Sequence, residues 1–249
     1  MPCVPSWAPA RRPSHPPLAR AASPRWTSPA AARFAADTTG AVGAGAHAVH
    51  LHPCDDDGRE TLVGAIVDAT VATIRVANPG VPIGVSTGAW ILPHPTARVR
   101  AIADWREPDF AGVNLSEPGH RQVMAALSAA GIGIEAGIWA VEDVDALERC
   151  RYADRVLRVL GEPADDDPRS AVARAEAIDG ALDVLGIGAP RLHHGYGLAT
   201  WVVLRHAIEH GHGIRVGPED TFVLPDGERA ADNGALVAAA AALAGRIAL

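Results

Sequence analysis

Short apolar runs alternate with Ala-rich helical stretches along most of this chain, and this alternation constrains the fold more than any other feature. Each apolar run is typical of a β-strand, and a helical stretch follows it before the next run begins, at a spacing of roughly 25–35 residues. Strands that alternate with helices predict an α/β protein with a parallel sheet. The seven runs cover residues 47–52, 82–87, 110–115, 133–139, 154–160, 191–195 and 214–217.

Seven such units, with one more expected in residues 1–46, make the eight units of a (β/α)8 TIM barrel. A barrel of this kind typically takes about 250 residues, and the chain has 249. A doubly wound open sheet is the alternative, but it usually carries a Gly-rich turn after its first strand. Here Pro53, Cys54 and three Asp follow the first run, so we predict the barrel.

The first 36 residues differ in composition from the rest. They contain eight Pro and five Arg and no acidic residue, whereas all 29 Asp and Glu lie in residues 37–249. Proline interrupts helices and strands, so we predict an irregular leader over 1–36 and a barrel domain over 37–249. We expect residues 1–27 not to supply a well-paired strand, which makes the first barrel strand atypical or missing. Because a missing strand exposes two sheet edges, we also expect a homo-oligomer.

All 22 residues in the Lys and Arg class are Arg, and the chain has no Lys. This excludes a Schiff-base lysine, a P-loop lysine and a carbamylated-lysine metal bridge. The formal net charge of −7 argues against a nucleic-acid partner, which needs a basic face. No apolar run is long enough to span a membrane. Three widely spaced Cys indicate neither a disulfide framework nor a Cys-type zinc site, so we expect a cytoplasmic protein.

Two histidines at the end of the first run form the main candidate for a metal site. In a strand, residues two apart point to the same face, so His50 and His52 share a face while His47 lies on the opposite one. Active sites of (β/α)8 barrels lie at the carboxyl ends of the strands. Two ordinary histidines are the alternative, but a same-face pair at this position favours a shared metal ion.

The last run ends in a second group of chemically active residues, RVGPED. Arg215 lies in the run, and Glu219 and Asp220 follow in the loop beyond it, again at the expected barrel mouth. Two His and one carboxylate make an open metal site that leaves a position for substrate. Adjacent carboxylates can divide the work, one as a ligand and one as a base. A helix-capping Asp and a solvated Glu are the ordinary alternative.

Weaker candidates end other predicted strands, where hydroxyl and N–H groups ahead of a helix suit a carboxylate or carbonyl oxygen. These are Ser86, Thr87, Gly88 and Ala89 in one turn, and Asn114, Ser116 and Glu135 after or within the next two runs. Each alone is equally an ordinary strand-end residue. His193 and His194 end a later run, and strand alternation lets only one of them face inward.

Five segments carry a resemblance to a known family. They are AGAHAVHLHPCDDDGRETL, GVSTGAW, VNLSE, RLHHGYGLATW and RVGPEDTFVLPDGERAADNGALVAAA. Over about residues 37–246 the chain resembles the β-keto acid cleavage enzymes, whose best-known type is the 3-keto-5-aminohexanoate cleavage enzyme of lysine fermentation. The resemblance implies a zinc-bearing (β/α)8 barrel that converts a β-keto acid and acetyl-CoA into acetoacetate and a new acyl-CoA.

The resemblance also implies roles for individual residues. His50, His52 and Glu219 match the Zn²⁺ ligands, Asp220 matches the base and Arg215 its partner. The substrate-holding turn matches Ser86, Gly88 and Ala89, and we add Thr87, Asn114, Ser116 and Glu135 as substrate-binding candidates. In this family an Arg usually stands at the position that Cys54 occupies here.

Two other functions remain open at the level of sequence. An amidohydrolase-type metal-dependent hydrolase also carries an H-x-H pair on a barrel strand, although its bridging lysine is impossible here. A degenerate, non-catalytic barrel is the other, suggested by the leader and by Cys54. Dependence on acetyl-CoA separates the first alternative from the β-keto acid reaction, and metal content together with turnover separates the second.

Overall fold

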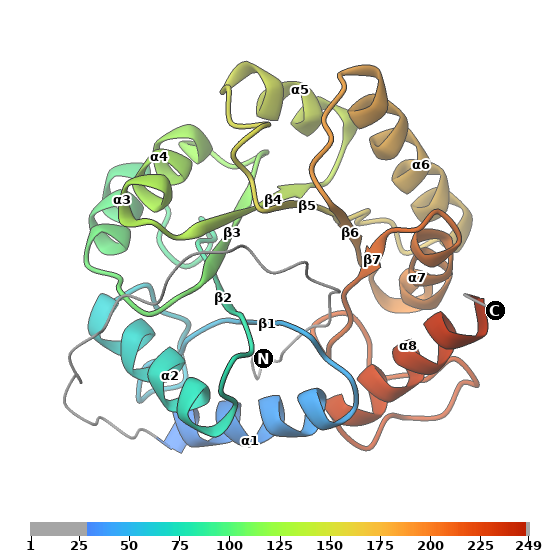
Figure 1. Cartoon of the computed structure of the whole chain (residues 1–249), viewed down its shortest axis with the longest axis horizontal. Helices are drawn as coiled ribbons and strands as arrows, with labels where there is room; N and C mark the ends of the chain where they lie inside the picture. The colour runs from blue at the N-terminus through green and yellow to red at the C-terminus, as the bar shows by residue number, and fades with distance from the viewer. Residues whose placement is uncertain (1–28, 248–249) are drawn as a thin grey trace.

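The computed structural model of this chain describes residues 29–247. In chain order, short strands and helices alternate through almost the whole of this range (Figure 1). The strands are β1 (Val49–Leu51), β2 (Ile83–Ser86), β3 (Phe110–Asn114), β4 (Gly133–Ile138), β5 (Arg158–Gly161), β6 (Arg191–His193) and β7 (Gly213–Ile214). The helices are α1 (Pro29–Gly43), α2 (Gly64–Ala77), α3 (Pro95–Ala103), α4 (His120–Ala130), α5 (Val141–Arg149), α6 (Pro168–Val184), the 3-10 turn η1 (Gly197–Ala199), α7 (Thr200–Glu209) and α8 (Asn233–Ile247).

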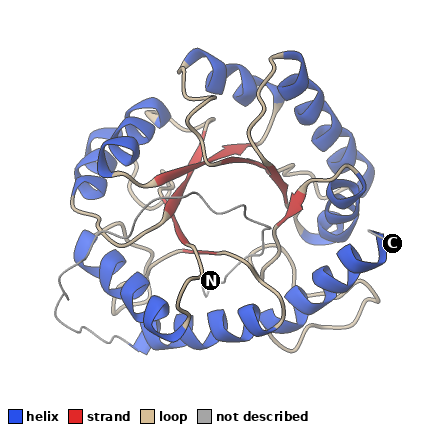
Figure 2. Cartoon of the chain, in the orientation of Figure 1, coloured by secondary structure: helices blue, strands red, loops and turns tan. Residues whose placement is uncertain are grey.

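The strands form one parallel sheet in the order β1 to β7, each paired with the next along the chain. The sheet curls, and the helices surround it as an outer layer (Figure 2). This arrangement confirms the predicted (β/α)8 barrel architecture. Within residues 29–247, β1 and β7 are the two edge strands of the sheet.

The outer helices continue across the opening between these two edges. Helix α1 packs against both α2 and α8, so the first and last helices of the described range are neighbours (Figure 1). A separate apolar cluster fills the space beneath them, and its larger buried side chains are Leu204, Ile214, Val216, Leu236, Val237 and Leu243. Helix packing therefore holds together the part of the barrel in which strand pairing stops.

The predicted boundary between leader and barrel at residue 37 is wrong, because α1 crosses it. Residues 29–36, which we assigned to the irregular leader, are helical. Residues 30–43 contain no proline and are rich in Ala, the strongest helix former, so the proline-based argument ends at residue 29. The predictions for residues 1–27, including the atypical or missing first strand, lie outside the described residues.

Local sequence explains where individual helices begin and end. Asp167 caps α6 by accepting a hydrogen bond from the Ser170 backbone N–H at 2.9 Å, and Pro168 stands at the first helical position, where it needs no donor. Gly131 ends α4 with a φ of 73°, a left-handed conformation that favours glycine. None of the described helices combines the length and the apolar character needed to cross a membrane.

Gly84 in β2 gives a test of how tightly the sheet packs. A Cβ at this position would overlap the ring of Phe110, which is fully buried on β3. We expect Gly84→Ala to lower the free energy of unfolding by about 1–3 kcal/mol, the usual cost of overpacking a core. Urea unfolding measures it, with Gly180→Ala as the control, because a Cβ at Gly180 on α6 meets nothing within 4 Å. A Gly84→Ala protein as stable as the wild type would contradict this account.

Candidate active site

A cavity of about 170 Å³ lies at the carboxyl ends of the strands, where barrel enzymes place their chemistry. Eight of the residues predicted from sequence line it, and they come from five strands or the loops that follow them. They are His50, His52, Ser86, Gly88, Asn114, Glu135, Arg215 and Glu219. Seven further residues complete the lining: Trp90, Gly112, Gly137, Trp139, Leu160, Glu162 and Tyr196.

His50 is buried at the wall of this cavity, with 4 % of its surface exposed. Its Nδ1 lies 3.7 Å from Glu135 Oε1 and makes no hydrogen bond within the described structure. Burial, followed by the positive charge of Arg215, holds the pKa of His50 well below its ordinary value. The imidazole is therefore neutral at pH 7 and offers a lone pair.

His52 lies beside His50, with 5.4 Å between the ring centroids, and faces two carboxylates. Its Nδ1 is 3.1 Å from Glu60 Oε1, and its Nε2 is 3.6 Å from Glu219 Oε2. Glu60 also accepts a hydrogen bond from Trp90 Nε1 at 2.7 Å, and its hydrogen bond with His52 is the main cause of its lowered pKa. Glu60 thus orients His52 so that Nε2 points towards Glu219.

Arg215 forms an ion pair with Glu219 inside the cavity, and 5 % of Arg215 is exposed. Burial alone would lower the pKa of this guanidinium, but the carboxylates of Asp220, Glu162 and Glu135 raise it. Its Nε makes no hydrogen bond in the described structure. Arg215 is therefore a fixed positive charge with one donor left for another acceptor.

His194 connects two carboxylates at the floor of the site. Its Nδ1 is 2.8 Å from Asp220 Oδ1, and its Nε2 is 2.9 Å from Glu162 Oε2. Burial opposes the charged imidazole, but the Asp220 carboxylate and then the Glu162 hydrogen bond outweigh it and raise the pKa of His194 to about 9. His194 is therefore protonated at pH 7 and donates from both nitrogens. Asp220 is 4 % exposed and lies behind the cavity rather than on its lining.

The two adjacent histidines face opposite ways, as strand alternation requires. His194 points inward to Asp220 and Glu162, whereas His193 Nε2 lies 3.2 Å from Asp179 Oδ1 on α6. The sequence alone left open which of the two faces the site. The structure assigns that position to His194.

The turn after β2 differs from its predicted role. Ser86 Oγ faces the cavity and accepts a hydrogen bond from the Gly88 N–H at 3.1 Å. Thr87 Oγ1 instead donates to the Gly112 carbonyl at 2.7 Å, so this hydroxyl ties β2 to β3. Only Ser86 and Gly88 of this turn line the cavity.

Two other substrate-binding candidates are also placed away from the cavity lining. The Ala89 N–H donates to Glu117 Oε2 at 2.9 Å, and Arg98 holds the same carboxylate oxygen at 2.5 Å. Ser116 is exposed on the loop after β3. Glu117 follows Ser116 in the chain, and its carboxylate accepts the hydrogen bond from the Ala89 N–H, which we expected to face a substrate.

Sequence reasoning missed Arg158, Glu162 and Tyr196. Arg158 forms an ion pair with the buried Glu135, and the Tyr196 hydroxyl lies 3.5 Å from Glu162 Oε2. The run predicted over 154–160 stopped two residues before Glu162, whereas β5 ends at Gly161. Applying the strand-end rule to the true end of β5 would have found Glu162.

The three predicted zinc ligands surround one cavity, but they do not form a converged ligand set. Among the described residues, the group whose ligand atoms all lie within 4.8 Å of one another is Asp179, His193 and His212, outside this cavity. The three predicted ligands do not converge because Arg215 forms an ion pair with the Glu219 carboxylate. The structure therefore holds a potential metal site, at a place that the sequence did not indicate.

The charged His194 predicts a pH-dependent stability. Its folded pKa of about 9 lies above the ordinary value of 6.5, so its stabilising effect is complete below pH 6.5 and is lost as the pH rises through 9. We expect metal-free His194→Gln to be less stable than the wild type by about 3 kcal/mol at pH 6, with a smaller difference at pH 9.5. Urea unfolding across this range measures it, with the exposed His210→Gln as control. A difference that stays constant with pH would refute the bridging charge.

Comparisons with known proteins show the family and the fold of the chain. The family model for beta-keto acid cleavage enzymes matches residues 29–153 and 167–248. The apo structure of ObcA superposes with a TM-score of 0.67 at 18 % identity, covering 84 % of this chain and 59 % of that one, so this chain spans about three fifths of ObcA and the likeness shows the fold. No curated protein matches the sequence.

Two further solved structures match with TM-scores of 0.44. An isomerase from Streptomyces coelicolor A3(2) is 20 % identical, over 70 % of this chain and 44 % of that one. A mandelate racemase/muconate lactonizing protein from Herpetosiphon aurantiacus is 16 % identical, and the match covers 71 % of this chain and 47 % of that one. The family model covers most of the chain, including β1, β7 and the residues that follow each of them, and leaves out residues 154–166, which contain β5. The chain belongs to the beta-keto acid cleavage enzyme family.

Proposed function

We propose that this chain transfers the acyl group of a β-keto acid to coenzyme A, using acetyl-CoA and releasing acetoacetate and a new acyl-CoA. One observation carries the proposal: two neighbouring imidazoles, a carboxylate and a buried guanidinium line one cavity at the carboxyl ends of the strands. Family membership supports the reaction class. The cavity supplies both a set of metal donors and a positive charge for an anionic substrate.

The donor types at the cavity suit a zinc ion, and binding would require the three side chains to converge and Glu219 to leave Arg215. His50 Nδ1 is buried without a hydrogen bond, and His52 Nε2 and Glu219 Oε2 lie 3.6 Å apart. Two imidazoles and one carboxylate are the protein ligands of an open catalytic zinc site. Bound there, Zn²⁺ would act as a Lewis acid that polarises the keto carbonyl of the substrate.

Arg215 binds the anionic end of the substrate in this proposal. Its side chain is buried and fully charged, and its pairing with Glu219 shows that a carboxylate fits against it. A β-keto acid presents such a carboxylate. Because the guanidinium is held in place by surrounding acids, it orients the substrate without first having to be ordered.

Asp220 is the base in this proposal: it lies behind the cavity lining, so its carboxylate has to turn towards the substrate to accept the proton from the carbon between the two carbonyl groups. His194 holds Asp220 Oδ1, while Asp220 Oδ2 makes no hydrogen bond within the described structure and is left to take the proton. The resulting carbanion attacks the acetyl carbonyl of acetyl-CoA, a C–C bond forms, and the C–S bond breaks to release the CoA thiolate. The thiolate attacks the original keto carbonyl, the adjacent C–C bond breaks, and acetoacetate takes the proton back from Asp220.

The size of the cavity favours a short β-keto acid. Its volume of about 170 Å³ is below the roughly 300–1,000 Å³ of pockets that enclose drug-sized ligands. Only the keto acid and the acetyl thioester have to enter, and the rest of the CoA lies outside. Trp90 and Trp139 line the cavity and are partly exposed, so they form its rim towards solvent.

Acetoacetate formation tests the proposal. The purified chain, loaded with Zn²⁺, is incubated with a panel of short β-keto acids with and without acetyl-CoA. We expect acetoacetate and a new acyl-CoA only when both substrates are present. Hydrolysis without acetyl-CoA would indicate the amidohydrolase alternative, and metal binding without any turnover would indicate a degenerate barrel.

Two finer expectations stay predictions alongside this function. A homo-oligomer is expected because β1 and β7 are edge strands within residues 29–247, and light scattering of the purified chain tests it. A cytoplasmic location is expected from the cysteine usage, and cell fractionation tests it.

A further inference from the structure

A second cluster of histidines lies on the outer side of the sheet, away from the candidate active site. It comprises Asp179 from α6, His193 from β6, His206 from α7 and His212 just before β7, and we call it the outer histidine cluster. Asp179, His193 and His206 are buried and His212 is half-buried. Four segments of the fold thus bring nitrogen and oxygen donors to one point.

The Asp179 carboxylate is the centre of this cluster. His193 Nε2 lies 3.2 Å from Asp179 Oδ1, and His212 Nε2 lies 3.5 Å from Asp179 Oδ2. His206 Nε2 is 3.8 Å from the same Oδ2. The ligand atoms of Asp179, His193 and His212 all lie within 4.8 Å of one another.

These separations match the geometry of a metal site. Around a tetrahedral ion with bonds of about 2.0–2.1 Å, two ligand atoms are separated by about 3.3–3.4 Å. His193 lies 3.2 Å from Oδ1 and His212 lies 3.5 Å from Oδ2, so each imidazole is close to this separation from one of the two oxygens of Asp179, and all three ligand atoms lie within 4.8 Å of one another. The contact of His212 with Asp179 is at the upper limit of a hydrogen bond. A metal ion bound by both groups would therefore interact with each of them more strongly than they interact with one another.

Buried polar atoms without partners point to the same conclusion. Asp179 Oδ2 and His206 Nε2 are buried and make no hydrogen bond within the described structure. An unsatisfied buried polar atom costs about 1–3 kcal/mol, and the two occur side by side, 3.8 Å apart. A bound cation beside Oδ2 would remove the cost at the carboxylate.

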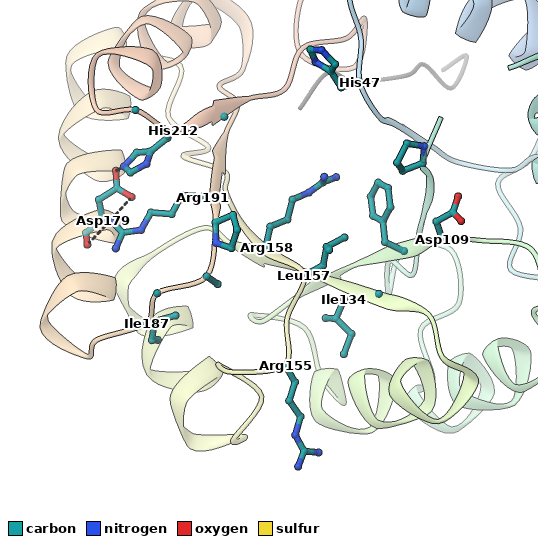
Figure 3. A pocket seen from close by; sticks show the side chains of 18 of the residues that line it. His47, Asp109, Ile134, Arg155, Leu157, Arg158, Asp179, Ile187, Arg191 and His212 are labelled. Atoms are coloured by element: carbon teal, nitrogen blue, oxygen red, sulfur yellow. Dashed lines mark hydrogen bonds and ion pairs between the residues drawn. The ribbon is translucent and has the colours of Figure 1, made fainter. Parts of the chain in front are cut away.

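Charge and access also suit a cation. Arg191 pairs with Asp179 Oδ1 at 3.3 Å and with Asp183, so two carboxylates face one guanidinium and the group keeps a net negative charge. Asp179, Arg191 and His212 line a large cavity at the amino ends of the strands, and Figure 3 shows them together on one side of it. An ion can therefore reach Asp179 from solvent.

We propose that Asp179, His193 and His212 bind a divalent transition-metal ion of the zinc class, at a site separate from the candidate active site. Three protein ligands leave a fourth position, which His206 or a water molecule fills. Imidazole and carboxylate ligands suit zinc and its neighbours in the first transition row. The ion links α6 to β6 and to the loop before β7, so its role is to hold the last three units of the described barrel together.

Metal content per chain tests this site. The full chain is loaded with Zn²⁺, dialysed, and assayed for bound metal alongside His212→Ala, Asp179→Asn and the control His210→Ala. His210 is exposed and neighbours His206 and His212 in ring contact, without an interaction with Asp179 in the structure. We expect His212→Ala and Asp179→Asn each to lose one metal ion per chain and His210→Ala to lose none. Equal metal content in His212→Ala, Asp179→Asn and the wild type would overturn the proposal.

A variant that keeps all ligands provides a second test. A Cβ at Gly161 would lie 2.5 Å from His193 Nδ1, so Gly161→Ala displaces this imidazole without removing a donor. Loaded with Co²⁺, the wild type should show the visible absorption of a tetrahedral cobalt site, measured in the His50→Ala background to exclude the candidate active site. We expect Gly161→Ala to weaken that absorption, with circular dichroism confirming a folded chain. Unchanged absorption in a folded Gly161→Ala protein would contradict ligation by His193.

The same measurements separate this site from the proposed function. His50→Ala affects only the candidate active site, and His212→Ala only the outer histidine cluster. If the outer site is real and the zinc site of the proposed function is not, the wild type binds one ion, His50→Ala keeps it and His212→Ala loses it. If the reverse holds, His50→Ala loses the ion and His212→Ala keeps it, which refutes the outer site.

Discussion

Asp220→Asn is expected to lower turnover by about 10²–10⁴-fold, the usual contribution of a positioned general base. The amide keeps the size of the carboxylate but cannot take a proton. Asp220 is buried, and one of its oxygens is held by His194 at 2.8 Å while the other makes no hydrogen bond in the described structure. Single-turnover measurement of acetoacetate formation checks the expectation, with the exposed Asp226→Asn as control.

Metal content distinguishes a base from a ligand in this variant. Asp220 neighbours the predicted ligand Glu219 in sequence but is not itself needed for metal binding, so Asp220→Asn should keep its zinc. Loss of the zinc would mean that Asp220 acts as a ligand. Turnover at the wild-type level would transfer the role of base to Glu135, a buried carboxylate 3.7 Å from His50 Nδ1.

The barrel could be predicted because each of its units carries its own signal. An apolar run followed by an Ala-rich stretch predicts a strand and a helix locally, and parallel pairing follows from the alternation. The same local rule placed His50 and His52 on one face, and both line the cavity. The boundary expected at residue 37 falls inside α1, because it was placed at the first acidic residue, whereas α1 begins at Pro29, the last proline of the leader.

Parts of the site that depend on distant segments could not be predicted. Thr87 and Ala89 follow β2 as the turn pattern predicts, but the Gly112 carbonyl and the Glu117 carboxylate take their donors. Both partners lie more than twenty residues away in sequence, and no local pattern indicates the pairing. Single-residue candidates in turns are weak for this reason.

The outer histidine cluster shows the same limit more strongly. Asp179 lies in the middle of α6, where an acidic side chain usually faces solvent, and His212 lies in a turn before a strand rather than after one. Neither position follows the strand-end rule that locates the chemistry of barrels. Only the packing of α6 and α7 against the sheet brings Asp179 to His193.

His50→Ala is expected to remove the metal ion of the candidate active site and to reduce acetoacetate formation to the rate without enzyme. With one of three protein ligands gone, too few remain to hold the ion. His50 Nδ1 makes no hydrogen bond in the described part of the chain, so its removal breaks no other hydrogen bond at that atom. The matched control is His47→Ala, because His47 lies in the same segment but lines the opposite cavity.

The measurement has to count the two proposed metal sites separately. In the His212→Ala background the outer histidine cluster no longer contributes, so any remaining zinc belongs to the candidate active site. There, adding His50→Ala should take the zinc content to zero, while adding His47→Ala should leave it unchanged. If stoichiometric zinc stays on the folded His50→Ala, His212→Ala protein, His50 is not a ligand. That result would contradict the metal-dependent mechanism, because the proposal of a zinc site at the cavity depends on His50 Nδ1, which is buried and makes no hydrogen bond in the described structure.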